Sequence, residues 1–377
     1  MLNLQNELTT GIFLKRENRF VIEVKIKDQV YKAHLPNPGR LWELLLPGRV
    51  VYLEKKFNSA LKFKTIGCQK NGSFVLLDTH YTNTLIANLI EEKKIPSLLD
   101  FSLKSKEVKV ENSRIDLLLE SKNKEKFFLE VKTCTLFGKC MAMFPDAVSK
   151  RASKHLLELA RLSNQGYKAG VLFVVMNPDV NYFLPAYHID PEFSRLLIRF
   201  KDVLYIGAIG IEFNQSFKVK SIKNLEIPFD LLEKEFKDSG AYLLVLYINK
   251  YFQLKVNKRK WEIKPGCYVY VGSAMKGLEA RIKRHLRKKK RLKWHIDYLG
   301  IYAERIIPIP IRSAERLECK VANKLKCIAD EVILGFGSTD CKCESHLFYF
   351  ETDPILNPEF QEVLTYFRLD RLCFYLS

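Results

Sequence analysis

Long apolar runs are missing from this chain of 377 residues, and none approaches the roughly 20 residues that a membrane-spanning helix needs. The first residues, Met-Leu-Asn-Leu-Gln-Asn-Glu, lack the basic-then-apolar pattern of an export signal. Internal repeats and low-complexity tracts are also absent, apart from one basic run in the second half. We therefore expect a soluble cytoplasmic protein that has no membrane partner.

Cysteines are too few and too irregularly spaced to form a disulfide framework. There are nine of them, which is an odd number. Reduced thiols are therefore expected in place of disulfides.

Acidic residues are scarce relative to basic ones. The chain has 43 Asp and Glu against 62 Lys and Arg, which gives a formal net charge of +19. Such a balance favours a polyanionic partner, and nucleic acid is the simplest one. A membrane surface, or merely a lysine-rich composition, would give the same balance.

The length and the apolar content of 47% predict a globular protein of two or three domains. In the first 80 residues, short alternating runs are separated by turns such as Pro36-Asn-Pro-Gly39 and Asn71-Gly72. This spacing indicates a small β-barrel or sandwich, and an oligonucleotide-binding (OB) barrel fits it. Candidate phosphate contacts in this region, unless they are merely solvated, are Arg16, Arg19, Arg40 and Arg49.

The next part of the chain alternates helix and strand patterns. A helix over 82–93 precedes a β-hairpin over 108–132, and Asp146 or Ser149 can cap a helix that runs to about Leu162. Residues 171–176 and 209–213 read as buried strands. This order predicts a compact α/β domain.

The composition becomes polar and charged from Asn214 to Gly240, with one short helix near 229–236, and a second unit starts at Ala241. In it we expect strands over 242–248 and 267–271, and helices over 277–287 and 314–326. The predicted domains are a barrel over 1–80, an α/β domain over 81–225, a linker over 226–238 and a C-terminal domain over 239–377.

Two carboxylates and a lysine occupy neighbouring strand positions. Glu130 and Lys132 project from one face of a strand because side chains alternate, and Asp116 lies on the other arm of the hairpin. Carboxylate oxygens suit Mg²⁺ or Mn²⁺, which activates water and polarises a phosphodiester. Lys132 would stabilise the charge that develops. The alternative for a Glu-x-Lys triplet is a solvated strand edge.

Six segments together resemble the sugar fermentation stimulation protein A (SfsA) family over residues 12 to about 213. They are Ala33–Arg40, Leu45–Gly48, Ser113–Asp116, Leu129–Lys132, Phe144–Ala147 and Lys154–Leu156. The resemblance implies an OB-like barrel joined to a nuclease core of the PD-(D/E)xK type, with DNA binding. It places Asp116, Glu130 and Lys132 in the signature of that core. Pro38 departs mildly from the family, which usually carries Thr in that loop.

The segment that follows the hairpin offers further candidates. Asp146 is either part of this site or only a helix cap. Arg151, Lys154 and His155 share one face of the predicted helix, where they could meet phosphates, although His155 alone reads as a surface histidine.

The C-terminal unit contains Gly240-Ala-Tyr242 and Tyr270-Val-Gly272, followed by Leu278–His285. These segments resemble the GIY-YIG nuclease superfamily, and within it a little-characterised domain family that bears Trp294–Leu299 and Gly335–Cys343. The resemblance implies an α/β domain with these catalytic residues: Tyr242, Tyr270, Arg281, His285 and the metal-binding Glu318. Ala241 replaces the usual isoleucine, and no clear asparagine ends the motif set. The alternative is a pair of core tyrosines, or a domain that binds nucleic acid without cutting it.

Nine Lys and Arg side chains and no acidic one lie between residues 281 and 293. Next to Arg281, this run predicts a phosphate-contacting patch, and Trp294 directly after it could stack on a base. The alternative is a solvated loop and a core tryptophan. The candidate contacts in the run are Arg284, Arg287, Lys288, Lys289, Lys290 and Arg291.

Cys341, Cys343 and His346 have the residue types of a zinc site, which Cys319 or His295 could complete. Cys-x-Cys is tighter than the usual spacing, and small buried thiols are common. We therefore treat zinc as the weaker cofactor candidate, after Mg²⁺ or Mn²⁺.

Taken together, the sequence predicts an α/β multidomain protein: an OB-like barrel, a PD-(D/E)xK-like core and a GIY-YIG-like domain. The expected function is DNA binding with divalent-metal-dependent phosphodiester hydrolysis. One rival is a non-catalytic DNA-binding regulator, for example of sugar metabolism gene expression, and another is an RNA-processing enzyme. The paired carboxylates favour metal use, because carboxylates repel phosphate unless a cation intervenes.

Overall fold

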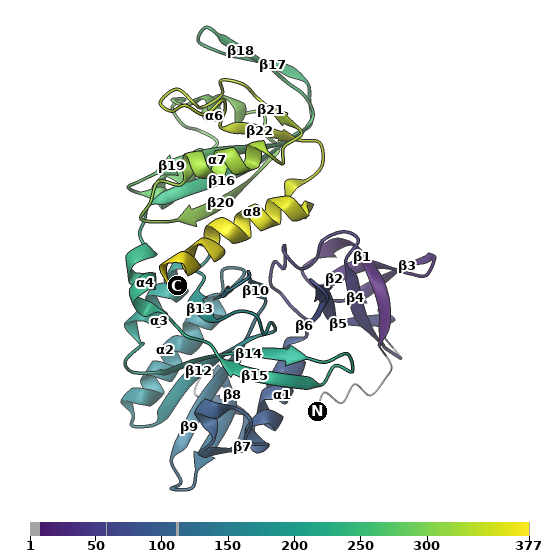
Figure 1. Cartoon of the computed structure of the whole chain (residues 1–377), viewed down its shortest axis with the longest axis vertical. Helices are drawn as coiled ribbons and strands as arrows, with labels where there is room; N and C mark the ends of the chain where they lie inside the picture. Colours follow the sequence, from purple (N-terminus) through teal and green to yellow (C-terminus); the bar gives the residue numbers. More distant parts are fainter. Residues whose placement is uncertain (1–7, 58, 111–112, 377) are drawn as a thin grey trace. The chain divides into compact units, whose positions relative to one another are not determined.

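The computed structural model describes residues 8–57, 59–110 and 113–376 (Figure 1). Residues 1–7, on which the export-signal prediction rests, and residues 111–112 of the predicted hairpin lie outside the described residues. The chain divides into two compact units, Met1–Phe229 with Leu372–Ser377, and Asp230–Arg371. No helix among the described residues has the length and apolar character that crossing a membrane requires.

The first unit begins with a closed five-stranded barrel. It closes through a parallel pairing of Ala33 with Phe63. Strand interiors follow the period of two, because Ile22 and Val24 are buried while their neighbours are not. The strands, with β6 added at the edge, are β1 (Thr9–Asn18), β2 (Val21–Ile26), β3 (Gln29–His34), β4 (Val50–Lys55), β5 (Phe63–Lys70) and β6 (Ser73–Leu76).

Next comes a six-stranded mixed sheet in the order β15-β14-β12-β9-β8-β7. β9 and β14 run parallel to β12 on either side of it, and β8 and β9 form the predicted hairpin. The strands are β7 (Phe101–Val110), β8 (Ser113–Ser121), β9 (Lys126–Cys134), β12 (Lys168–Val175), β14 (Tyr205–Phe213) and β15 (Val219–Asn224). Three helices accompany the sheet: α1 (Thr79–Glu91), α2 (Lys150–Asn164) and α3 (Pro191–Arg199).

A smaller sheet and a shared core complete this unit. The small sheet joins β10 (Leu136–Phe137), β11 (Met141–Phe144) and β13 (Tyr182–Pro185). Barrel and large sheet share one continuous apolar core, in which Phe74 packs edge-on against Phe213 at 5.3 Å between ring centroids. The barrel is therefore built onto the α/β part.

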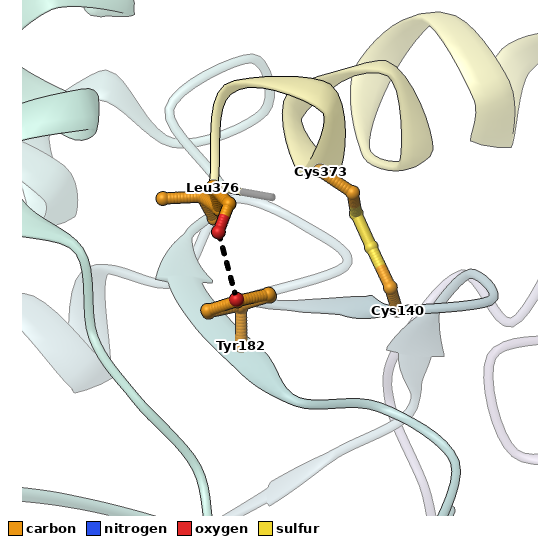
Figure 2. Close-up of a disulfide and its surroundings, with 4 residues drawn as sticks. All are labelled: Cys140, Tyr182, Cys373 and Leu376. Atoms are coloured by element: carbon orange, nitrogen blue, oxygen red, sulfur yellow. Dashed lines mark hydrogen bonds between the residues drawn. A yellow bond between two sulfur atoms is a disulfide. The ribbon is translucent and has the colours of Figure 1, made fainter.

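The last residues of the chain belong to the first unit. A disulfide joins Cys140 to Cys373, and the Tyr182 hydroxyl donates a hydrogen bond to the Leu376 carbonyl oxygen at 3.3 Å (Figure 2). The expectation that all thiols are reduced is wrong for this pair. The two cysteines are 233 positions apart, so no local spacing marks them.

The second unit is a five-stranded sheet in the order β20-β16-β19-β22-β21. Its apolar core includes Tyr242, Tyr268 and Phe336. The strands are β16 (Gly240–Ile248), β19 (Gly266–Ala274), β20 (Arg305–Arg312), β21 (Glu331–Val332) and β22 (Leu347–Phe350), with a separate hairpin of β17 (Phe252–Val256) and β18 (Arg259–Ile263). The helices are α5 (Leu278–Leu286), α6 (His295–Leu299), α7 (Glu318–Lys326) and α8 (Pro358–Arg368), after α4 (Phe229–Glu235) at the border between units.

The predicted fold class is confirmed: a mixed α/β chain with an N-terminal OB-type barrel, an α/β core and a C-terminal α/β domain. One detail differs in the first unit. Ser149 caps α2 by accepting a hydrogen bond from the Ala152 amide at 3.2 Å. Asp146 is not the cap, because it is turned toward the barrel loop and accepts from the Leu41 amide at 3.1 Å.

Candidate functional site

Asp116 and Glu130 lie side by side on the antiparallel strands β8 and β9. The Val131 amide donates to Asp116 Oδ2 at 2.9 Å, and the Asp116 amide donates to Glu130 Oε2 at 3.4 Å. The hairpin register thus brings together two carboxylates that are 14 residues apart in the sequence. Glu130 is only 1% exposed, so its charge requires compensation within the protein.

Two basic side chains supply this compensation. Lys132 Nζ and His155 Nδ1 both form hydrogen bonds to Glu130 Oε1, and they lie 3.5 Å from each other. Lys132 reaches Glu130 because i and i+2 share a strand face, while His155 comes from α2. His155 is 4% exposed, so its interpretation as a surface histidine is wrong.

The two carboxyl groups have different proton affinities. Burial and the neighbouring Glu130 raise the pKa of Asp116 to about 6. Burial alone would also raise the pKa of Glu130, but Lys132 and His155 overcome it and lower that pKa to about 2. A proton on the pair is therefore held by Asp116, and Glu130 stays ionised.

Asn83 on α1 also belongs to this cluster, although no sequence pattern predicts it. Its amide donates to Asp116 Oδ1 at 2.8 Å, so both Asp116 oxygens have protein donors. An isolated asparagine in a helix carries no motif, and only the packing of α1 against the sheet brings it here.

The donor set fits a divalent cation. A buried and a half-buried carboxylate converge beside one lysine, and hard oxygen ligands of this kind suit Mg²⁺, Mn²⁺ or Ca²⁺. Such a cation would satisfy the negative charge that now raises the pKa of Asp116.

The arginines of the barrel have defined partners. Arg16 donates to the carbonyl oxygens of Gly39 at 2.6 Å, Arg40 at 2.8 Å and Arg19 at 2.7 Å, and Arg19 donates to that of Pro38 at 3.2 Å. Arg16 therefore holds the loop whose sequence carries the family resemblance.

Of the remaining predicted contacts of the first unit, Arg49 is half-buried and donates to the Glu43 carbonyl oxygen at 3.2 Å, whereas the others are exposed. The Arg40 guanidinium lies 4.8 Å from the ring centre of Trp42, and Arg151 and Lys154 are exposed on α2. The predicted common face with His155 does not exist, because His155 turns inward to Glu130.

Asp146 lies beside the same barrel loop. It is half-buried, and this burial raises its pKa although the Leu41 amide, Arg40 and Arg16 oppose the rise. Gly39 packs directly against it, since a Cβ on Gly39 would come within 2.3 Å of Asp146 Oδ2. Asp146 thus links the barrel loop to the segment before α2.

In the second unit, Tyr242, His285 and Asp297 form a chain of hydrogen bonds. The Tyr242 hydroxyl lies 2.9 Å from His285 Nε2, and His285 Nδ1 lies 3.2 Å from Asp297 Oδ1. Burial lowers the pKa of His285 to about 4, so this histidine is neutral at physiological pH. It then donates from Nδ1 to Asp297 and accepts at Nε2 from the hydroxyl.

Asp297 carries no predicted role, yet it is completely buried and organises this region. Arg284 donates to both of its oxygens, at 3.0 and 2.8 Å, and the amides of Lys293 and Trp294 donate to Oδ2 at 3.0 and 3.1 Å. These donors hold the pKa of Asp297 well below its usual range against the opposing effect of burial.

The other predicted residues of this unit surround the tyrosines. The Tyr270 ring centre is 6.4 Å from that of Tyr242, and the Arg281 guanidinium lies 4.4 Å from the Trp294 ring centre. Glu318 has partners on both oxygens: His346 Nδ1 at 3.2 Å from Oε1, and the Ser273 hydroxyl on Oε2. A cation bound by Glu318 would have to replace one of them.

The basic run separates into two groups. Arg287, Lys288, Lys289 and Arg291 are exposed, whereas Lys290 is half-buried with Nζ 3.6 Å from Asp297 Oδ1. Arg284, bound to Asp297, also lies 4.2 Å from the Trp294 ring centre. Trp294 is therefore contacted by cations, and it is half-buried against the apolar core of this unit.

The comparisons with known proteins divide the chain in three. Family models match residues 14–77 (SfsA N-terminal OB domain), 80–215 (Sugar fermentation stimulation protein RE domain) and 241–369 (Domain of unknown function DUF123).

Relatives extend the match over the first half of the chain. A sugar fermentation stimulation protein homolog from Methanosphaera stadtmanae is 40% identical over 198 residues, which cover 51% of this chain and 82% of that protein. The homolog from Clostridium tetani is 38% identical over 197 residues, covering 52% and 86%.

A solved structure, Pyrococcus furiosus SfsA in complex with Ca²⁺, is similar with a TM-score of 0.55 and 30% identity, covering 59% of this chain and 96% of that one. The barrel lies largely within the match to the SfsA N-terminal OB domain, and the mixed sheet lies largely within the match to the RE domain. The chain belongs to the sugar fermentation stimulation protein (SfsA) family and carries an additional C-terminal domain of the DUF123 type.

Proposed function

We propose that this protein binds DNA and hydrolyses phosphodiester bonds with Mg²⁺ or Mn²⁺ held by Asp116 and Glu130. The observation that supports this most is the convergence of Asp116, Glu130, Lys132 and His155 in one cluster, in which Glu130 and His155 are buried. A surface that binds DNA by charge alone gains nothing from buried carboxylates.

Two comparisons support the same proposal. The OB-type barrel belongs to a class of folds that binds oligonucleotides, and the net charge of +19 suits a polyanion. The SfsA of Pyrococcus furiosus was solved in complex with Ca²⁺, a cation that prefers oxygen ligands as Mg²⁺ does.

The chain's own residues would divide the work. When bound, the metal ion would supply a water of lowered pKa and polarise the phosphate. Lys132, fixed by Glu130, would stabilise negative charge that develops on the phosphate oxygens. His155 would hold Glu130 in place, and Asn83 would do the same for Asp116.

The test is cleavage of single-stranded DNA, double-stranded DNA and RNA with Mg²⁺, Mn²⁺ or EDTA. Glu130→Gln and Asp116→Asn should abolish metal-dependent cleavage while leaving DNA binding. The matched control is Glu120→Gln. Glu120 lies on β8, the strand that carries Asp116, but it forms an ion pair with Lys104 near the surface. Salt-sensitive DNA binding without cleavage of any substrate would favour the non-catalytic regulator, and cleavage confined to RNA would favour the processing enzyme.

A second candidate, a GIY-YIG-like phosphodiesterase in the second unit, is supported by the hydrogen bond between Tyr242 and His285. A neutral histidine positioned by Asp297 could accept the tyrosine proton. Cleavage that persists in Glu130→Gln and disappears when Tyr242→Phe is added would place chemistry there. Cleavage unchanged by Tyr242→Phe in either background would rule this candidate out.

A further inference from the structure

Three cysteines and one histidine of the second unit converge at a place that the proposed nuclease chemistry does not use. Cys319 lies in the first turn of α7, and Cys341, Cys343 and His346 lie in the loop that leads into β22. Their ligand atoms all lie within 4.8 Å of one another, and Cys341 Sγ is 3.3 Å from His346 Nε2. Tetrahedral zinc with Zn–S near 2.3 Å separates two sulfurs by about 3.8 Å, so this spacing is close to what the ion requires.

The backbone of the loop is fixed before any metal is considered. The Gly335 amide donates to the Glu344 carbonyl and the His346 amide to the Phe336 carbonyl, both at 2.8 Å. Ser345 Oγ, which is buried, accepts from the Leu347 amide at 2.9 Å. These bonds hold the loop ends together on both sides of Cys341 and Cys343, so the ligands need little reorganisation to bind.

The second ring nitrogen of His346 has the partner that a zinc-bound histidine usually has. His346 is 1% exposed, and its Nδ1 lies 3.2 Å from Glu318 Oε1. A carboxylate beside Nδ1 favours the tautomer that carries its proton there, and this tautomer leaves the Nε2 lone pair directed at Cys341 Sγ. Glu318 immediately precedes Cys319, so one helix end supplies a ligand and the group that orients another.

We propose that Cys319, Cys341, Cys343 and His346 bind one zinc ion in a closed structural site. Three thiolates and one imidazole fill all four positions of a tetrahedral ion, which leaves none for water or substrate. The three thiols are free in the structure, and a disulfide between any two would leave the third cysteine and His346 unused. The site goes beyond the proposed nuclease function and does not depend on it.

Such a site would connect the loop and α7 to the tyrosine cluster. Glu318, held by His346, also accepts a hydrogen bond from Ser273 on β19, the strand that carries Tyr270. Zinc would therefore fix the position of Glu318, and with it one wall of the region around Tyr270. Glu318 acts in this scheme as a positioning residue.

The experiment is metal analysis of the untagged, full-length protein, purified with a phosphine reductant and without chelator. Inductively coupled plasma mass spectrometry should find close to one zinc per chain, and the zinc K-edge spectrum should fit three sulfurs and one nitrogen. Removing the metal with a chelator and adding ZnCl₂ should restore one equivalent, which tests the site without any substitution.

Variants make the assignment specific. Cys341→Ser, Cys343→Ser and His346→Ala should each lose most of the zinc, whereas His346→Cys should retain it with four sulfurs. Cys327→Ser is the matched control, because Cys327 is an exposed cysteine at the other end of α7, outside the cluster.

Two results for the wild-type protein would overturn the proposal: a zinc content below about a tenth of an equivalent even after ZnCl₂ addition, or a zinc spectrum without sulfur ligands. So would zinc that is unchanged in Cys341→Ser and Cys343→Ser. If the wild-type protein contains one zinc per chain but cleaves no DNA, this result would count against the proposed nuclease function and not against the zinc site.

Discussion

Glu130 of the first unit and Asp297 of the second are buried, and Asp116 beside Glu130 is half-buried, but the surroundings of these carboxylates differ in a way that separates two roles. Asp116 and Glu130 crowd together, with one lysine and one histidine nearby, and burial next to Glu130 raises the pKa of Asp116 to about 6. Asp297 stands alone and receives hydrogen bonds from Arg284, His285 and two backbone amides.

This difference shows what a buried carboxylate can still do. Asp297 is fully neutralised by protein donors, so it stabilises the structure and has little to gain from a cation. In the first unit, every carboxylate oxygen has a donor but two negative groups adjoin each other, and a divalent ion would reduce the repulsion that raises the pKa of Asp116. Counting the charges around each carboxylate is therefore more informative than burial alone.

The largest effect should come from Glu130. If this pair holds the metal, Glu130→Gln should lower metal-dependent cleavage on the order of a thousandfold, because the variant removes a charged ligand. The rate should be measured at saturating Mg²⁺ with a labelled DNA duplex. Glu120→Gln should cleave DNA like wild type. Equal cleavage rates for Glu130→Gln and Glu120→Gln would contradict the assignment of Glu130 as a metal ligand.

Asp297 should show its role in stability. Asp297→Ala leaves Arg284 without its bidentate partner, and the loss from breaking a buried ion pair is about 3 to 5 kcal/mol. Urea unfolding of the full chain, followed by tryptophan fluorescence, should show earlier unfolding of the second unit, which contains Trp261 and Trp294. Metal-dependent cleavage by the first unit should persist at low urea. A variant as stable as wild type would mean that Asp297 is not the anchor described above.

Both the metal affinity and the stability of the first unit should depend on the protonation of Asp116. Because the raised pKa of Asp116 is about 6, a proton competes with the metal below that pH, and affinity should fall about tenfold per pH unit there. Without metal, the folded protein binds this proton more tightly than the unfolded chain, so stability should increase as pH falls from about 6 to about 4. Calorimetric Mn²⁺ titrations between pH 5 and 8 measure the first effect, and denaturant unfolding in EDTA measures the second. Metal affinity that is flat over this range would contradict the position of Asp116 in the site.

A smaller effect should come from the exposed basic run. Replacing Arg287, Lys288 and Lys289 by Ala should weaken DNA binding about tenfold at moderate salt and reduce the slope of log K against log salt by about 3, because each phosphate contact contributes about one. The charge-matched control replaces Lys122, Lys124 and Lys126, which are exposed around the β8–β9 turn. Fluorescence anisotropy at several salt concentrations distinguishes the two, and identical slopes would mean that net charge alone drives binding.

Sequence reasoning went furthest where a local period determines geometry. The alternation of a strand places Glu130 and Lys132 on one face, and the hairpin brings Asp116 to them. The direction of a helix face is not encoded locally, so the sequence predicts His155 at the surface although it contacts Glu130. Asn83 and Asp297 lack a motif altogether, and only tertiary packing gives them partners. The ligand cluster could be predicted only in part, because Cys319 lies 22 positions before Cys341 in the sequence and joins it through the fold.

The bond between Cys140 and Cys373 gives the chain an unusual connectivity. Residues 230–371 leave the first unit after Phe229 and return to it at Leu372, and the bond closes a covalent ring that contains this whole second unit. A single peptide cut at any point between the two cysteines opens the ring into two chain segments, which the disulfide still joins. Under oxidising conditions, the C-terminal domain therefore stays attached to the first unit after any single cut between the two cysteines, and its release requires either a reductant or a second cut.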